Sequence, residues 1–179
     1  MRRRVGIKMM LTLAAFVVAV PLALAADVSQ EVMTKYILAT VKAFRTVYAK
    51  SIVEQAKKAG VKPNENWTKD DHAIMLPAQF VKAAGAELKD FELGLIGLTP
   101  IYKSNLPKTE AETDALKKMM ANPDQKIMTF TDGTQFKGLA GDFAIAQSCA
   151  DCHNQHPSSP KKDFKQGDLM GAIVVRFSH

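Results

Sequence analysis

The stretch Cys149-Ala150-Asp151-Cys152-His153 decides how the fold and chemistry of this chain are interpreted. It has the pattern C-x-x-C-H, which is the attachment signature of c-type haem. Two thiols three positions apart can add to the two vinyl groups on one edge of a porphyrin, and the adjacent imidazole can then bind the iron. The motif therefore predicts one covalently bound haem c, anchored by Cys149 and Cys152, with His153 as an iron ligand.

Two other interpretations of the motif remain open. A redox dithiol or a disulfide could happen to precede a histidine, and the two cysteines could form half of a zinc site. The zinc site would need a second C-x-x-C or H-x-x-x-H pair. The chain has only two cysteines, and no second histidine pair has a suitable spacing. Evidence of export favours haem, because haem is attached in this way outside the bacterial cytoplasm.

The N-terminal segment predicts export. Three arginines at positions 2–4 and Lys8 form a positive region, residues 9–24 are almost uninterruptedly apolar, and Ala23-Leu24-Ala25 is a small-x-small cleavage site. These features define a secretory signal peptide. The apolar run of about 16 residues is short for a membrane span, which needs roughly 20. We therefore expect a signal peptide over residues 1–25 and a single periplasmic domain over residues 26–179, with no membrane span in the mature chain.

The net charge of +6 comes mostly from that segment. The chain has 24 Lys and Arg and 18 Asp and Glu, so loss of the four basic residues of the signal peptide leaves 20 basic against 18 acidic residues. No basic stripe is interleaved with aromatic residues, as in nucleic-acid-binding proteins. We expect no nucleic-acid partner.

The first half of the expected domain reads as helical. Residues 28–59 predict one long amphipathic helix that ends at Gly60 and Pro63. Its apolar stripe is expected to pack on the core, to cover part of a haem face, or to form a homodimer with a second copy. The stripe consists of Met33, Ile37, Val41, Phe44, Tyr48 and Ile52.

A loop over residues 61–74 holds Trp67 and His72, and Pro77 then opens a second helix at its favoured first position. Phe80, Val81, Ala84 and Leu88 are expected to face inward from that helix. A later helix begins with a capping box of Thr109 and Glu112 and ends near Met120.

The remaining segments predict strands. The apolar period changes to two from Phe91, and residues 126–131 and 134–146 read as a hairpin whose turn is Asp132-Gly133. Gly138 and Gly141 suggest a bulge in the second strand. Residues 171–177 form a closing strand after the haem motif. We therefore expect an α+β domain with an antiparallel sheet that forms one wall of the haem pocket.

The region from Cys149 to Val175 contains more than the C-x-x-C-H motif. His156-Pro157, Ser159-Pro160 and Gly167-Asp168 follow it in that order. Together with Leu76-Pro77-Ala78-Gln79-Phe80 and Asn105-Leu106-Pro107, these motifs resemble the periplasmic PAS-like haem c domain family, long catalogued as a domain of unknown function. The resemblance is strong over the last 30 or so residues and looser before them.

This resemblance implies a PAS-like fold, covalent haem at Cys149, Cys152 and His153, and a role in electron transfer or in redox or small-ligand sensing. It does not supply the sixth iron ligand, because family members differ there and this chain has no third cysteine. The chain also lacks the transmembrane, kinase and methyl-accepting parts of sensor relatives, which weakens a direct signalling role.

Several residues are candidates for the sixth ligand. His72 is the first, because its loop could fold over a haem; Met75, Met33 or water are the alternatives. His156 lies too close to His153 to reach the opposite face, so we expect it to bond a propionate or backbone near the motif, or only to order its loop. His179 is the last residue and is expected to be frayed.

Electron transfer by a mono-haem cytochrome is the function that the sequence favours, with a periplasmic redox protein as partner. The alternative is a redox or gas sensor that binds nitric oxide or carbon monoxide. We expect no enzymatic activity, because a peroxidase-like reaction would need a distal Arg or His that the sequence does not identify.

Overall fold

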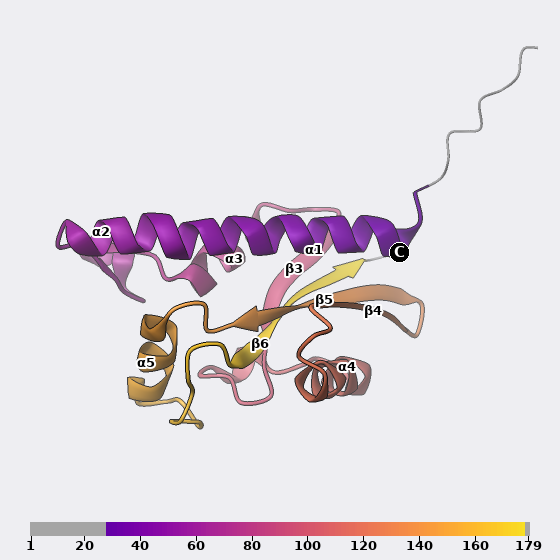
Figure 1. Cartoon of the computed structure of the whole chain (residues 1–179). Coiled ribbons are helices and arrows are strands. Elements are labelled where there is room, and N and C mark those ends of the chain that lie inside the picture. The colour runs from indigo at the N-terminus through magenta and orange to yellow at the C-terminus, as the bar shows by residue number, and fades with distance from the viewer. Residues whose placement is uncertain (1–27, 178–179) are drawn as a thin grey trace, which may run out of the picture.

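A computed structural model describes residues 28–177 and shows an α+β domain in three layers (Figure 1). The helices are α1 (Gln30–Val47), continued by η1 (Tyr48–Val53) and α2 (Glu54–Lys58), then α3 (Pro77–Ala86), α4 (Glu110–Ala121) and α5 (Gln147–Gln155). The strands are β1 (Lys62–Pro63), β2 (Ala73–Ile74), β3 (Phe91–Ile96), β4 (Ile127–Asp132), β5 (Gln135–Phe143) and β6 (Leu169–Phe177), with short 3₁₀ turns at Trp67–Lys69 and Lys103–Asn105. The expected α+β class, antiparallel sheet and long N-terminal helix are confirmed.

The main sheet has four antiparallel strands in the order β3-β6-β5-β4. The last strand, β6, lies in the interior of the sheet and alternates between its two faces. Ala172 and Val174 pack against α4 with Leu116 and Met119, whereas Ile173 and Val175 pack against α1 and α3 with Leu38 and Val81. Because β6 is buried on both faces, it reads as a nearly continuous apolar run rather than as an alternating one.

The long helix forms as expected over residues 30–58, but part of its predicted stripe was assigned to the wrong face. Ile37, Val41 and Tyr48 pack inward, whereas Phe44 and Ile52 are 62% and 54% exposed and Met33 is also exposed. The inward face instead contains Thr34, Leu38, Arg45, Ala49 and Val53. A buried threonine and a buried arginine do not score as apolar, so the true face was hidden in the pattern.

The helix is also not α-helical throughout. Residues Tyr48–Val53 form a π-helical segment between α1 and α2, which the sequence did not predict. Such wide turns are frequent at functional sites. Here the Tyr48 ring stacks on Phe80 of α3, with centroids 4.5 Å apart, and its hydroxyl donates to the Met75 carbonyl oxygen at 2.8 Å. The π segment therefore fixes the start of α3 and the end of the preceding loop.

Smaller expectations need correction. Ala84 and Leu88 are exposed, so of the four residues expected to face inward only Phe80 and Val81 do so. The hairpin turn consists of Gly133 and Thr134, because Asp132 pairs with Gln135. The register between β5 and β6 shifts at Asp142/Phe143, where Met170 of β6 is the unpaired residue, rather than at Gly138 or Gly141.

Gly138 in β5 has a packing role instead. A Cβ there would lie 2.5 Å from the Thr34 side chain and 2.8 Å from that of Leu38. The glycine thus lets α1 lie directly on the sheet.

Several predictions concern residues outside those that the structure describes. The signal peptide over residues 1–25 and the position of His179 both lie there, and they stay predictions. Within residues 28–177, no helix is both long enough and apolar enough to cross a membrane.

Candidate haem-attachment site

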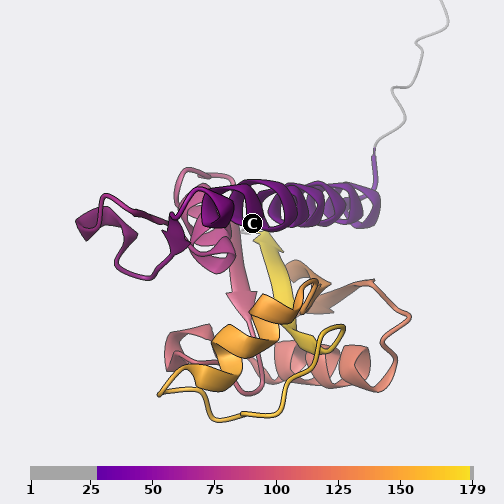
Figure 2. The same cartoon turned by 60° about the vertical axis from the view of Figure 1, so that its left-hand side comes forward.

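The C-x-x-C-H motif lies on helix α5, which follows β5 and lies below the C-terminal part of the long helix (Figure 1, Figure 2). Positions 149, 152 and 153 are related as i, i+3 and i+4, so they share one face of the helix. Cys149 and His153 are half-buried, and Cys152 is exposed. Both cysteines are free thiols. Ala150, between the two cysteines, is fully buried and packs with Ala144 and Phe164, and Cys149 packs against the same cluster, which holds the helix against the end of the sheet.

A loop after α5 folds back and brings an aromatic ring onto His153. Asn154 clamps this loop: its side-chain amide donates to the Phe164 carbonyl at 2.8 Å, and its amide oxygen accepts from the Phe164 N–H at 2.9 Å. The Phe164 ring then meets the His153 imidazole edge to face, with centroids 5.7 Å apart. The clamp therefore limits how the imidazole can rotate.

The Gly167-Asp168 motif returns the chain to the sheet. Gly167 has a φ of +93°, a conformation that favours glycine. Its N–H donates to the Ala144 carbonyl at 2.8 Å, and the Ala144 N–H donates to the Asp168 carbonyl at 2.9 Å. The Asp168 carboxylate accepts from the Lys165 N–H at 2.9 Å. This turn ties both ends of the segment that contains α5, so the helix is fixed at its entry and exit.

His156 ends α5 and is surrounded by side chains from two other loops. Its Nδ1 accepts from the Ser158 N–H at 3.1 Å, and its Nε2 lies 3.5 Å from Glu65 Oε1. Tyr102 donates to Glu65 Oε2 at 2.6 Å and places its ring edge-on to the imidazole, 5.8 Å between centroids. His156 thus orders the loop after the motif; its expected contact with a propionate stays a prediction.

Arg45 of α1 lies within electrostatic range of the motif. It is buried, and its Nη1 pairs with Asp142 Oδ1 at the end of β5 at 2.9 Å. Its Nε, however, is the one buried side-chain polar atom without a hydrogen-bond partner in the part of the chain that the structure describes. Such atoms are rare and call for an explanation, such as a partner that is not part of the chain. Lys42 and Lys126 lie nearby, over the Phe143 ring.

The surroundings of the motif shift the pKa of two of its side chains. Desolvation, assisted by the charges of Arg45 and His156, lowers the pKa of His153, which favours the neutral imidazole that binds metals. Desolvation, assisted by the charges of Glu65 and Cys149, raises the pKa of Cys152.

The candidates for a sixth ligand come from two different parts of the fold. His72 has an exposed side chain, and its backbone N–H bonds Asp70 Oδ1 at 2.9 Å. Met75 is half-buried in the same loop, next to Tyr48. Met33 lies near the start of α1, at the end of the helix far from α5 (Figure 1). The structure brings Cys149, Cys152 and His153 together on one face of α5, and ligation by His72, Met75 or Met33 stays a prediction.

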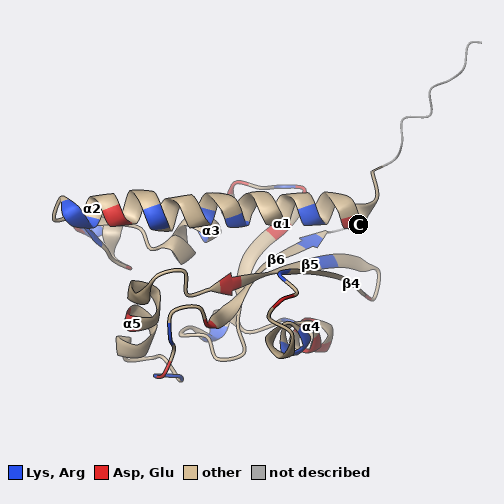
Figure 3. Ribbon diagram, viewed as in Figure 1, with Lys and Arg blue, Asp and Glu red and all other residues tan. Residues whose placement is uncertain are grey.

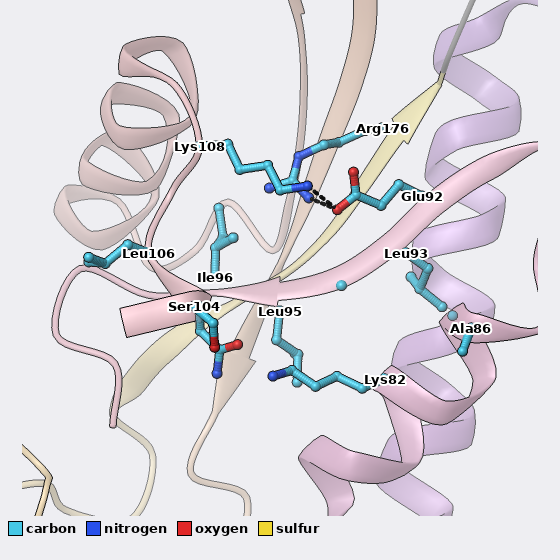
Figure 4. Close-up of a pocket in the computed structure, with 13 residues that line it drawn as sticks. Lys82, Ala86, Glu92, Leu93, Leu95, Ile96, Ser104, Leu106, Lys108 and Arg176 are labelled. Atoms are coloured by element: carbon cyan, nitrogen blue, oxygen red, sulfur yellow. Dashed lines mark hydrogen bonds and ion pairs between the residues drawn. The ribbon is translucent and has the colours of Figure 1, made fainter. Parts of the chain in front are cut away.

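A cavity of about 310 Å³ lies elsewhere in the molecule, between α3, β3 and residues 104–108 (Figure 4). Its polar lining includes Lys82, Glu92, Lys108 and Arg176. None of the motif side chains lines it, so it is not the candidate haem site. A second cavity of about 30 Å³ touches Phe164 and Met170 and has room for only one or two water molecules.

Sequence reasoning missed Arg45, Asp142 and Phe164. A signal existed for the first: Arg45 is seven residues after Leu38 and so returns to the same helix face, where a charged residue is unusual. No comparable signal marks Phe164, because its contact with His153 depends on a ten-residue loop closure.

Comparison with known families places the chain. A family model described as Tll0287-like matches residues 24–178. Since this match covers nearly the whole sequence, the chain belongs to the Tll0287-like family. No curated protein matches it.

Among solved structures, the crystal structure of the cyanobacterial heme-protein Tll0287 is similar. The match has a TM-score of 0.56 and 16% sequence identity, and it covers 84% of this chain and 97% of Tll0287. At this identity the likeness supports the shared fold.

Proposed function

We propose that this protein is a periplasmic mono-haem c-type cytochrome that transfers single electrons to or from a redox partner protein. Cys149 and Cys152 would hold the haem through thioether bonds, and His153 would bind its iron. The observation that carries the proposal is the placement of two free thiols and a half-buried imidazole on one face of α5. The name of the structural neighbour, a haem protein, supports the same cofactor.

The residues present fit this cofactor in a second respect. The buried Nε of Arg45 has no acceptor among residues 28–177, and a haem brings two carboxylates that accept strongly from guanidinium groups. When bound, haem supplies a one-electron iron couple. The protein side chains would anchor it, orient the imidazole through Phe164, and set the charge around it through Arg45 and Asp142.

A redox or gas sensor is the second candidate function. The observation that favours it is the π-helical segment Tyr48–Val53, which interrupts the long helix only three residues after Arg45. A segment with irregular backbone bonding can change its winding at low cost. A change near the haem could then alter the loop that Tyr48 and Phe80 hold.

Covalent attachment is tested on the chain matured in a bacterium that exports and assembles c-type cytochromes. The intact mass should include one haem that survives denaturation and acid–acetone extraction. Cys149→Ser together with Cys152→Ser should abolish the added mass, whereas Ser148→Ala, an exposed neighbour on the same helix, should retain it. Haem that is extracted from the unsubstituted protein would contradict the proposal.

Optical spectra of the purified protein distinguish the two functions. A ferric low-spin spectrum and a ferrous form that does not bind carbon monoxide would support electron transfer, because both axial positions are then filled by the protein. Ready carbon monoxide binding would favour sensing. If His72 is the sixth ligand, His72→Ala should convert the low-spin spectrum to high-spin. An unchanged spectrum would move the assignment to Met75 or Met33.

A further inference from the structure

The cavity between α3, β3 and residues 104–108 contains an open part of the β3 edge (Figure 4). The Gly97 N–H points outward from this edge and donates to the Asn105 carbonyl oxygen at 2.9 Å. The backbone groups of an edge strand point outward at every second residue, so the N–H and C=O of Leu95 also point outward. Within residues 28–177, nothing bonds these two groups. The cavity therefore contains one unused backbone donor and one unused acceptor, side by side.

The same cavity is lined by a lysine without an acidic partner. Lys108 and Arg176 both donate to Glu92 Oε1, at 2.6 and 2.7 Å. Lys82 is exposed, and it forms no ion pair with any residue that the structure describes. It is the only charged residue of α3, whose ribbon is otherwise tan (Figure 3). In Figure 4 its side chain reaches along α3 towards Leu95, so a free positive charge lies beside the open backbone groups.

We propose that this cavity binds an N-acylated apolar amino acid, a small molecule with a free carboxylate, an adjacent amide N–H and an apolar side chain. Such a molecule pairs with Leu95 as one residue of an antiparallel strand pairs with another. Its amide N–H donates to the Leu95 carbonyl oxygen, and one carboxylate oxygen accepts from the Leu95 N–H. The second carboxylate oxygen accepts from Lys82, in a charge-assisted bond.

The antiparallel orientation agrees with the position of the charge. In a strand, the N–H of a residue lies on the side of the preceding residue and the C=O on the side of the following one. The Leu95 N–H is therefore nearer to Leu93, where α3 abuts the edge: a Cβ at Gly85 would lie 2.4 Å from the Leu93 carbonyl oxygen. The carboxylate of the ligand then lies towards α3 and Lys82, and its acyl group lies towards Leu106.

The surroundings of Leu95 favour an apolar ligand of one residue. Residues that are directly opposite in an antiparallel pair place their side chains on the same face, so the side chain of the ligand packs beside Leu95. Leu93 and the 42% exposed Leu106 line the same cavity. Because α3 covers the edge on one side and Asn105 covers it on the other, only one residue can pair. The volume of about 310 Å³ likewise suits a small molecule.

Calorimetric titration of the exported and matured chain tests the proposal. N-acetyl-L-leucine should bind with a Kd of about 1 mM or below. N-acetyl-L-leucine amide lacks the negative charge, and N-acetyl-N-methyl-L-leucine lacks the amide donor, so each should bind about fivefold more weakly or worse. Failure of N-acetyl-L-leucine to bind, or equal binding of the N-methylated form, would overturn the proposal. Acetate that binds as tightly would indicate a simple anion site and would also overturn it.

Two lysine variants test the role of the charge. Lys82→Gln should weaken the binding of N-acetyl-L-leucine about fivefold or more and leave the binding of the uncharged amide unchanged. Lys89→Gln removes an exposed lysine just after α3 that does not line the cavity, and it should change neither affinity. Equal losses in the two variants, or none in Lys82→Gln, would contradict the proposed contact.

Hydrogen exchange locates the ligand by a readout that does not depend on affinity. With N-acetyl-L-leucine bound, mass spectrometry should show slower exchange in the segment 91–97, because the Leu95 N–H gains an acceptor. N-acetyl-N-methyl-L-leucine at the same concentration should protect this segment less. Protection of another segment, with residues 91–97 unchanged, would place the ligand elsewhere and overturn the proposal.

Discussion

Two buried ion clusters lie on opposite sides of the sheet, and they differ in completeness. On the α4 side, Glu112 accepts from Arg176 Nε and Nη2 at 2.6 and 2.8 Å, from Lys137 at 2.8 Å and from the Lys108 N–H at 2.8 Å. On the α1 side, Arg45 pairs with Asp142 through one nitrogen, and its Nε has no partner in the part of the chain that the structure describes. Within residues 28–177, the first cluster is therefore complete and the second is not.

The pKa directions of the two acids reflect this difference. Burial alone would raise the pKa of Glu112, but the hydrogen bonds from Arg176, Lys137 and the Lys108 backbone lower it to about 2. Burial raises the pKa of Asp142, and the charges of Arg45 and Lys42 do not offset it. A buried acid is therefore well stabilised as an anion only in the completed cluster. The incomplete cluster lies next to the haem motif, where the proposed cofactor would add charged groups.

The largest expected effect is the loss of Glu112. Glu112→Ala leaves Arg176 and Lys137 buried without their main partner, and breaking such a buried network costs about 3–5 kcal/mol. Urea unfolding followed by circular dichroism should show a loss of this size. Lys117→Ala on the exposed side of the same helix should change the unfolding free energy by less than about 0.5 kcal/mol. A loss below 1 kcal/mol for Glu112→Ala would show that the network is not structural.

The second largest expected effect is the loss of stability as acid protonates Glu112 in the completed cluster. The folded pKa of Glu112 is lowered from 4.5 to about 2, so its contribution is fully present above pH 4.5 and is lost as the pH falls towards 2. The shift corresponds to on the order of 3 kcal/mol. Unfolding free energies measured between pH 7 and pH 3 should fall more steeply for the wild type than for Glu112→Gln. Parallel slopes would contradict this origin of the acid sensitivity.

The smallest effect on stability is expected at the incomplete cluster. Arg45→Met should lower the unfolding free energy by about 1–3 kcal/mol, less than Arg176→Met. Its main effect should instead fall on the proposed haem: removing a cation near its iron would disfavour the ferrous state, so the reduction potential should fall by roughly tens of millivolts. Potentiometric titration of the wild type and Arg45→Met measures the change in reduction potential, with Lys117→Ala as the control variant. An unchanged potential would place Arg45 outside the influence of the proposed haem.

The sequence predicted the ends of helices well where a residue type has a strong local backbone preference. Pro77 begins α3, the Thr109 side chain caps α4 by accepting from the Glu112 N–H at 3.2 Å, and Gly60 has a positive φ just after the long helix. In each case a local backbone preference determines the outcome. The α+β class followed from these local signals and from the change of apolar period at Phe91.

Prediction failed where the position of a side chain is set by contacts with segments far away in the sequence. Glu112 was read as half of a capping box, yet its carboxylate accepts from Lys108 and is buried against Arg176, 64 positions away. The long helix has two apolar faces and a buried Arg45, so a single stripe could not describe it. The motif residues were identifiable from their spacing, but the helix that presents them and the Phe164 contact depend on tertiary packing.

Gly85 of α3 has a consequence for how the sheet meets other molecules. A Cβ at this position would lie 2.4 Å from the Leu93 carbonyl oxygen, so the glycine lets the helix abut the outer edge of β3. Two residues further along β3 is Leu95, and then the Gly97 N–H donates to Asn105 at 2.9 Å. Along β3, the backbone N–H and C=O groups that point away from β6 belong to every second residue. Between Leu93, which α3 covers, and Gly97, which Asn105 covers, only those of Leu95 are left open.

Open strand edges are where β-proteins polymerise into aggregates. A glycine inside a helix costs about 0.5–1 kcal/mol relative to alanine. At position 85 it allows α3 to cover part of the β3 edge, which leaves too little open edge for another strand to pair with.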